Sequence, residues 1–219
     1  MDPWAVLWSQ RASLLAGFEN TLWLFFLSLP AAAGLGALGA MALRRTGPAR
    51  WAARVLVDAM RMLPFLLYAY LLYYGLPALG VRLSAWTVGF IGLITYHAAY
   101  VAEILRGAWA VLPAGQLEAA RACGYRTLPL YREIILPQLV LQSGPVLANQ
   151  AIILLKDTAF LSIITVRELT AAASAIQSTF FIPFQPLLAA IALYWILTLA
   201  VEAGAAGVRR LARRRGMAT

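Results

Sequence analysis

The chain has 219 residues, of which 62% are hydrophobic and 12% are charged, and it carries a formal net charge of +9. This balance is far from that of a soluble domain, so the composition excludes a sizeable water-soluble domain. It indicates an all-α, polytopic membrane protein.

Trp4, Trp8, Leu15 and Phe18 are spaced so that they lie on one face of a helix. The tryptophans favour a membrane interface, so we expect an interfacial helix over residues 3–18 on the outer side. The first unit of the chain is then residues 1–20.

Five apolar segments follow, and a helix needs about 20 residues to cross a bilayer. The first four segments are residues 21–43, 62–81, 83–102 and 134–155. The fifth, residues 169–201, is longer than one crossing needs, and Pro183 and Pro186 divide it. We therefore expect an outer helix up to about residue 180 and a last crossing from about residue 187.

Two of these segments carry local signals. In the first, Ala32, Gly36 and Ala40 recur every four residues, which predicts a ridge where another helix approaches closely. The second opens at Pro64 and closes at residues 75–77, because Pro77 cannot donate a hydrogen bond to the preceding turn.

The positive charges lie mainly in three clusters, which follow the first, third and fifth segments. The clusters are Arg44, Arg45, Arg50 and Arg54; Arg106, Arg121, Arg126 and Arg132; and Arg209, Arg210, Arg213, Arg214 and Arg215. Because successive segments cross in opposite directions, the three clusters lie on one side, which the positive-inside rule makes cytoplasmic. The N-terminus is then outside and the C-terminus is in the cytoplasm.

The longest connection on the cytoplasmic side covers residues 106–133. Residues 116–122 are good helix formers, and Gly124 lies where such a helix would end. Residues 127–133 predict a second short helix before Pro137. Two short helices with a sharp bend form a compact projection that suits the docking of a cytoplasmic partner.

The same connection contains a recognisable motif. Glu118-Ala119-Ala120 is followed by Gly124, Ile134 and Leu136-Pro137. This spacing resembles the EAA loop in the membrane subunits of bacterial ABC importers. Stretches at residues 99–107, 112–116, 134–138 and 155–158 resemble the subfamily that takes up histidine, glutamine, glutamate, arginine, lysine and related compounds.

The resemblance implies a type I importer permease with about five transmembrane helices per subunit, paired with an identical or homologous second subunit. It divides the chain into a transmembrane permease domain over residues 21–208, with the coupling loop at about 113–137, and a basic cytoplasmic tail over residues 209–219. An extracytoplasmic binding protein would deliver the amino acid, and the chain would lie in the bacterial inner membrane.

The resemblance also implies that the loop is a coupling helix seated in a groove of an ATPase subunit. Glu118 would supply a charge to that partner, Ala119 and Ala120 would allow its close approach, and Gly124 would permit the bend.

The chain has no phosphate-binding loop of its own, because its only lysine, Lys156, lies between Leu155 and Asp157. We expect ATP and Mg to be bound by the partner ATPase, and no catalytic residue, cofactor or metal in this chain. With Cys123 as the only cysteine and His97 as the only histidine, a usual zinc site is excluded.

Polar residues within the spans are candidates for the substrate pathway. A guanidinium at Arg61 can bind a carboxylate, although Met62 and Leu63 replace the glycine and threonine usual in the subfamily, and an interfacial anchor is the alternative.

Lys156, Asp157 and Thr158 match the family's Lys-Asp-Thr. The adjacent cation and anion can meet the two charged groups of an amino acid, and a gate or a packing salt bridge is the alternative.

His97 is a pathway candidate or a hydrogen-bonded packing histidine. Asn149 and Gln150 are weaker candidates of the same kind. For the whole chain, the alternative functions are an ion-coupled secondary transporter or channel subunit, and a membrane enzyme that uses His97.

Overall fold

The structure, a computed structural model, describes residues 2–214, and every regular element among them is a helix. The α-helices are α1 (Pro3–Ser9), α2 (Arg11–Leu43), α3 (Pro48–Met62), α4 (Phe65–Tyr70), α5 (Ala85–Ala110), α6 (Ala114–Ala122), α7 (Thr127–Pro129), α8 (Leu136–Asp157), α9 (Leu169–Phe180) and α10 (Gln185–Arg214). Four short π-helical or 3-10 segments adjoin these helices: η1 (Leu71–Gly75) and η2 (Leu76–Leu79) follow α4, η3 (Leu130–Ile135) joins α7 to α8, and η4 (Thr158–Ile164) follows α8.

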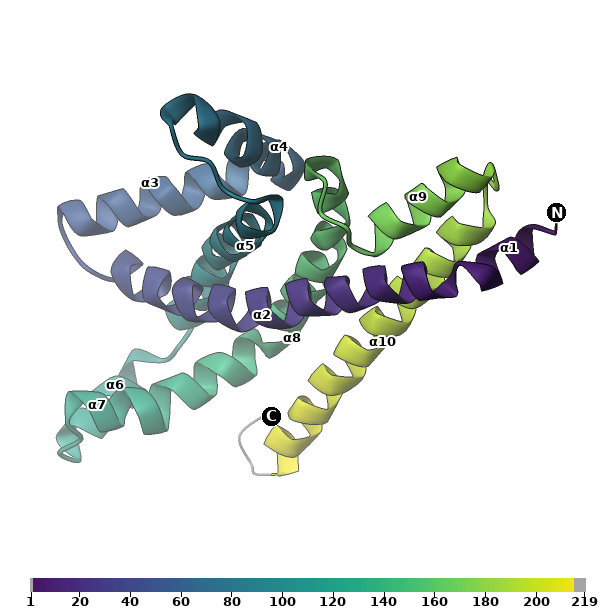
Figure 1. Cartoon of the computed structure of the whole chain (residues 1–219). Helices are drawn as coiled ribbons and strands as arrows, with labels where there is room; N and C mark the ends of the chain where they lie inside the picture. The colour runs from purple at the N-terminus through teal and green to yellow at the C-terminus, as the bar shows by residue number, and fades with distance from the viewer. Residues whose placement is uncertain (1, 215–219) are drawn as a thin grey trace.

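The expected set of about five spans is confirmed. Four helices are long and apolar enough to cross a membrane: Arg11–Leu43, Ala85–Ala110, Thr127–Ile164 and Gln185–Gly207. A fifth crossing is obtained if Pro48–Met62 and Phe65–Leu79 count as one broken span. The chain bends by 106° between these two helices. Figure 1 shows the α6–α7 connection and the C-terminal end of α10 low in the view, and α9 and the N-terminus at the upper right.

The N-terminal boundary differs from the expected one. The helix breaks at Gln10, between α1 and α2, and then continues without interruption from Arg11 to Leu43. Gly17, which could have ended it, is instead buried where α2 meets α9, and a Cβ there would lie 2.6 Å from the Cβ of Ala172. Residues 11–20 therefore form one helix with the first span.

The helix α3 is an element that our interpretation of the apolar segments did not predict. Leu63 is extended (φ −89°, ψ 138°), as expected for a residue before proline, so the chain turns sharply at Pro64. Two tyrosines of α5 hold this bend, because the Tyr96 hydroxyl donates to the Leu63 carbonyl at 2.9 Å and the Tyr100 hydroxyl donates to the Arg61 carbonyl at 3.3 Å.

The close approach predicted for the small-residue ridge is confirmed where α2 packs against α5. A Cβ on Gly36 would lie 2.6 Å from the Cβ of Val101 and 2.8 Å from the Ala98 carbonyl oxygen. Ala32, one turn earlier, is 1% exposed and belongs to the main core. Only glycine at residue 36 allows the two backbones to come this close.

The predicted division of the last apolar segment is also confirmed. α9 ends at Phe180, Phe181 adopts a left-handed conformation (φ 53°), and α10 begins at Gln185. The tail expected over residues 209–219 is helical as far as Arg214, and residues 215–219 lie outside the described part of the chain.

A buried carboxylate begins α9 and joins it to α10. Glu168 is fully buried, accepts hydrogen bonds from the backbone N–H groups of Thr170 and Ala171 at 2.7 Å each, and accepts a third from the Tyr194 hydroxyl at 2.9 Å. Burial raises the pKa of Glu168 above its usual range, and the backbone hydrogen bonds oppose that shift.

We predict that Gly36→Leu lowers the stability of the purified protein, because a side chain forced between α2 and α5 costs about 1–3 kcal/mol. Gly34→Leu is the matched control, since no atom lies within 4 Å of a Cβ at that position. Thermal unfolding in detergent measures the difference, and equal melting temperatures for the two variants would contradict the close packing described here.

Candidate functional site: the coupling loop and a polar cavity

The bend after α6 is a Schellman motif. The N–H of Tyr125 donates to the Ala120 carbonyl at 3.1 Å, and the N–H of Gly124 donates to the Arg121 carbonyl at 2.9 Å. Gly124 has φ +80°, which L side chains rarely adopt. No atom lies within 4 Å of a Cβ at this position, so the requirement for glycine comes from the backbone conformation and not from a steric clash.

The three motif residues of α6 do not face the same way. Glu118 and Ala119 are exposed, whereas Ala120 is 7% exposed and packs with Leu130, Ile135 and other apolar residues. The expectation that Ala120 lies on the exposed face for a partner's close approach is therefore wrong, because the helical turn of about 100° per residue points it inward. Ala120 instead holds α6 against the start of the next long helix.

The second helix of the loop is present, but it is not separate. Residues 127–133 continue through η3 into α8, so one unbroken helix runs from Thr127 to Ile164. Pro137 falls in the first turn of α8, directly after the π-helical η3, where a missing backbone N–H is tolerated, so it does not break the helix. A continuous run of helical turns, with Pro145 inside it, therefore connects the exposed loop to the far end of the molecule.

An ion-pair network lies between α3 and α5 near the loop. Glu103 accepts two hydrogen bonds from Arg106 at 2.6 and 2.7 Å and also lies 3.5 Å from Arg54 and 3.8 Å from Arg61. Arg61 also lies 3.8 Å from Asp58. The structure places Arg61 in this network, which is the arrangement expected of an anchor.

A cavity of about 450 Å³ lies between α4, α5 and α8, further along the same long helix. We call it the polar cavity because its otherwise mainly apolar and aromatic lining includes a carboxylate and an amide. The cavity is lined by Pro64, Phe65, Leu66, Tyr96, Tyr100, Gln150, Ile153, Asp157 and Phe160. Its lining brings one carboxylate and one amide together with several aromatic rings, in a site of the size that small ligands occupy.

His97 lies behind this cavity. It is 1% exposed, its Nδ1 lies 2.7 Å from the Gln150 amide nitrogen, and its Nε2 lies 3.4 Å from Asp157 Oδ2. His97 therefore contacts Gln150 and Asp157 of the cavity lining from behind, an arrangement that fits both a pathway residue and a hydrogen-bonded packing histidine.

The Lys156-Asp157-Thr158 motif does not converge on one point. Asp157 lines the cavity described above, while Lys156 lines a different one, of about 450 Å³, between α8, η4, α9 and α10. Thr158 is fully buried and donates to the Leu155 carbonyl at 2.7 Å. Successive helical residues point in different directions, so this lysine and aspartate cannot bind the two charges of one substrate here.

Sequence reasoning missed the tyrosines of the cavity and ranked Gln150 low. Tyr96 and Tyr100 are one turn apart in α5 and flank His97, so they were available as a signal. The surface of α4 that lies opposite these tyrosines depends on the bend at Pro64. The sequence does not predict the angle of that bend.

An exposed loop, several long apolar helices and a cavity between them are the features expected of the membrane subunit of a transporter. The model of the family "Binding-protein-dependent transport system inner membrane component" matches residues 32–214. The chain belongs to this family and is a permease subunit.

Several relatives are permeases. The chain is 35% identical to the octopine transport system permease protein OccM of Rhizobium radiobacter, over 91% of this chain and 85% of that protein. It is 29% identical to the probable glutamine ABC transporter permease protein GlnM of Bacillus subtilis, over 91% and 93%. It is 31% identical to the arginine ABC transporter permease protein ArtQ of Escherichia coli, over 69% and 74%.

Solved structures of ABC transporters are also similar to this chain. A crystal structure of an amino acid ABC transporter with histidines matches at a TM-score of 0.86 and 30% identity, covering 96% of this chain and 98% of that chain. An inward-facing MetNI methionine ABC transporter matches at a TM-score of 0.74 and 17% identity, which shows the fold alone.

Proposed function

We propose that this chain forms the membrane pathway of an ATP-driven importer that carries a polar amino acid into the bacterial cytoplasm. The single observation that carries the proposal is the continuous helix Thr127–Ile164, which bears the coupling loop at one end and Asp157 of the polar cavity toward the other. The relatives named for glutamine and arginine transport support the substrate class.

The partners follow from what this chain lacks and exposes. ATPase subunits bind ATP and Mg and dock on Glu118 and Ala119, the exposed face of α6. A second permease subunit, identical or homologous, completes the pathway, and an extracytoplasmic protein delivers the amino acid. No covalent chemistry takes place in this chain.

The chain lies in the bacterial inner membrane with its N-terminus outside and its C-terminus in the cytoplasm. The positive-inside rule supports this orientation, and so does the placement of α6–α7 and the arginine-rich end of α10 toward the same side of the molecule (Figure 1). The ATPase is then on the side where the loop is exposed.

Asp157 is the substrate-binding residue that the cavity favours most strongly. The described residues that line this cavity include one carboxylate and no cationic side chain, so the site attracts an ammonium or guanidinium group. Tyr96 and Tyr100 offer aromatic faces to the same cation. The substrate carboxylate must find its partner elsewhere, in a second subunit or at another position of this one.

Coupling is mechanical in this proposal. When the ATPase moves α6, the contact of Ala120 with Leu130 and Ile135 transmits the displacement to η3 and α8. α8 then carries Asp157 and Gln150 relative to the tyrosines of α5, which changes the access of the cavity from one membrane face to the other. An ion-coupled secondary transporter leaves the exposed α6 without a role and is not favoured.

We predict that Glu118→Arg reduces substrate-stimulated ATP hydrolysis by about tenfold or more, because misplaced charge at an interface costs about 2 kcal/mol or more. Glu19→Arg is the matched control, an exposed charge reversal on α2, outside the coupling loop. The assembled transporter in liposomes gives the rate. Equal stimulation in the Glu118 variant and the wild type would overturn the docking assignment, provided that both remain in the membrane.

We predict that Asp157→Asn lowers uptake by about tenfold or more, because a hydrogen bond to a charged group contributes about 1.5–3 kcal/mol. Gln142→Ala, an exposed change on the same helix, should keep wild-type uptake. Radiolabelled amino acid uptake into liposomes, driven by ATP and the cognate binding protein, measures both. Unchanged uptake and selectivity in Asp157→Asn would refute its place in the pathway.

A further inference from the structure

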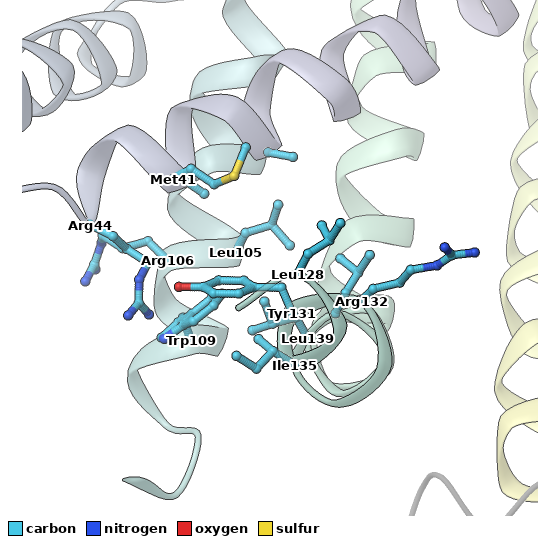
Figure 2. A pocket seen from close by; sticks show the side chains of 13 residues that line it. Met41, Arg44, Leu105, Arg106, Trp109, Leu128, Tyr131, Arg132, Ile135 and Leu139 are labelled. Carbon is cyan, nitrogen blue, oxygen red and sulfur yellow. The ribbon is translucent and has the colours of Figure 1, made fainter. Parts of the chain in front are cut away.

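A third cavity lies at the base of the coupling loop, away from the two cavities lined by Asp157 and by Lys156. It measures about 400 Å³ and lies between the ends of α2 and α5 and the segment α7–η3–α8 (Figure 2). Its lining is almost entirely apolar and includes Ala37, Ala40, Met41, Leu105, Ile135 and Leu139. The substrate proposal does not use this cavity, and its apolar walls do not suit a polar amino acid.

The cavity opens onto membrane-facing surface. Met41 and Leu136, which line it, are each 53% exposed, and Leu38 and Val140 continue the exposed apolar surface toward the middle of the same two spans. A hydrocarbon chain lying against α2 and α8 can therefore enter the cavity without leaving an apolar environment.

The other end of the cavity carries positive charge. Figure 2 shows the guanidinium groups of Arg44 and Arg106 on the same side of the cavity as the Tyr131 hydroxyl, while Arg132 points away. Arg106 is paired with Glu103, but among the described residues no carboxylate lies within ion-pair distance of Arg44. Arg44 instead stacks on Trp109, 3.6 Å from the ring centroid. A stacked guanidinium keeps the N–H groups at its edge available to an anion.

We propose that this cavity binds one anionic phospholipid, with an acyl chain between α2 and α8 and the headgroup phosphate at Arg44 and Tyr131. The proposal rests on the orientation given under the proposed function, since that orientation places Arg44 at the inner leaflet, where anionic lipids are found. The lipid would contact Trp109, Tyr131 and Ile135, which also pack at the base of α6. Its presence would therefore stiffen the junction between the loop and α8.

Charge complementarity favours a lipid over a soluble protein. A protein partner at this position would need an apolar side chain that reaches past the headgroup level into the span. A phospholipid would place its anionic headgroup at Arg44 and its hydrocarbon chain toward Leu38. This matches the order of positive charge and apolar surface along the cavity.

The test is native mass spectrometry of the purified full chain, titrated in detergent with palmitoyl-oleoyl phosphatidylglycerol or with the corresponding phosphatidylcholine. One phosphatidylglycerol should bind per chain, with at least tenfold preference over phosphatidylcholine. Arg44→Gln should weaken phosphatidylglycerol binding about tenfold, and Ala40→Phe, which fills the cavity, should abolish the bound lipid.

Two matched variants keep the test specific. Arg45→Gln removes the neighbouring charge, which does not line the cavity, and Ala33→Phe adds the same ring on an exposed face of α2. Both should bind phosphatidylglycerol like the wild type. Equal losses in Arg44→Gln and Arg45→Gln, no loss in a folded Ala40→Phe, or no preference between the lipids would overturn the proposal.

The last comparison tests whether a protein, and not a lipid, occupies the cavity. If Ala40→Phe released the ATPase subunits and left lipid binding unchanged, the cavity would be a protein contact and the proposal would be wrong. Because lipid binding is measured on the isolated chain, it is independent of whether the transporter carries an amino acid.

Discussion

The structure depends on the unbroken helix from Thr127 to Ile164. It begins in an exposed loop, and it carries Asp157 on the wall of a polar cavity near its other end. Ala120 packs against Leu130 and Ile135 and so holds α6 against the first turns of this long helix. The loop and the cavity therefore lie at the two ends of one helical run, with Pro145 between them.

The polar groups around this helix have separate roles. The network of Glu103 with Arg54, Arg61 and Arg106 fixes α3 against α5 on the loop side. The hydroxyls of Tyr96 and Tyr100 hold the bend at Pro64. The bend and the network together set the position of α4, which forms one wall of the cavity. Charged residues of the spans therefore have different roles. Those of the network stabilise helix packing, whereas the carboxylate of the polar cavity is a candidate binding group.

Much of this arrangement could be read from the sequence, because it follows from local signals. Length and charge placement predicted the spans, Pro183 and Pro186 predicted the break before α10, and Gly124 predicted the bend after α6. The expectations that were wrong depend on tertiary contacts or on side-chain direction. Ala120 points inward, Lys156 and Asp157 line different cavities, and the helix does not break near residue 20. Packing against α9 kept residues 11–20 in α2, and no periodicity reports such a contact.

The central claim is that the exposed face of α6 is covered by an ATPase. Cys123, the only cysteine, is exposed one residue before Gly124 and is therefore a natural reporter. In inside-out membrane vesicles, a membrane-impermeant maleimide should label Cys123 rapidly after the ATPase subunits are removed, and at least about tenfold more slowly when they are rebound. Labelling at the same rate with and without the ATPase, or labelling only in right-side-out vesicles, would contradict the account.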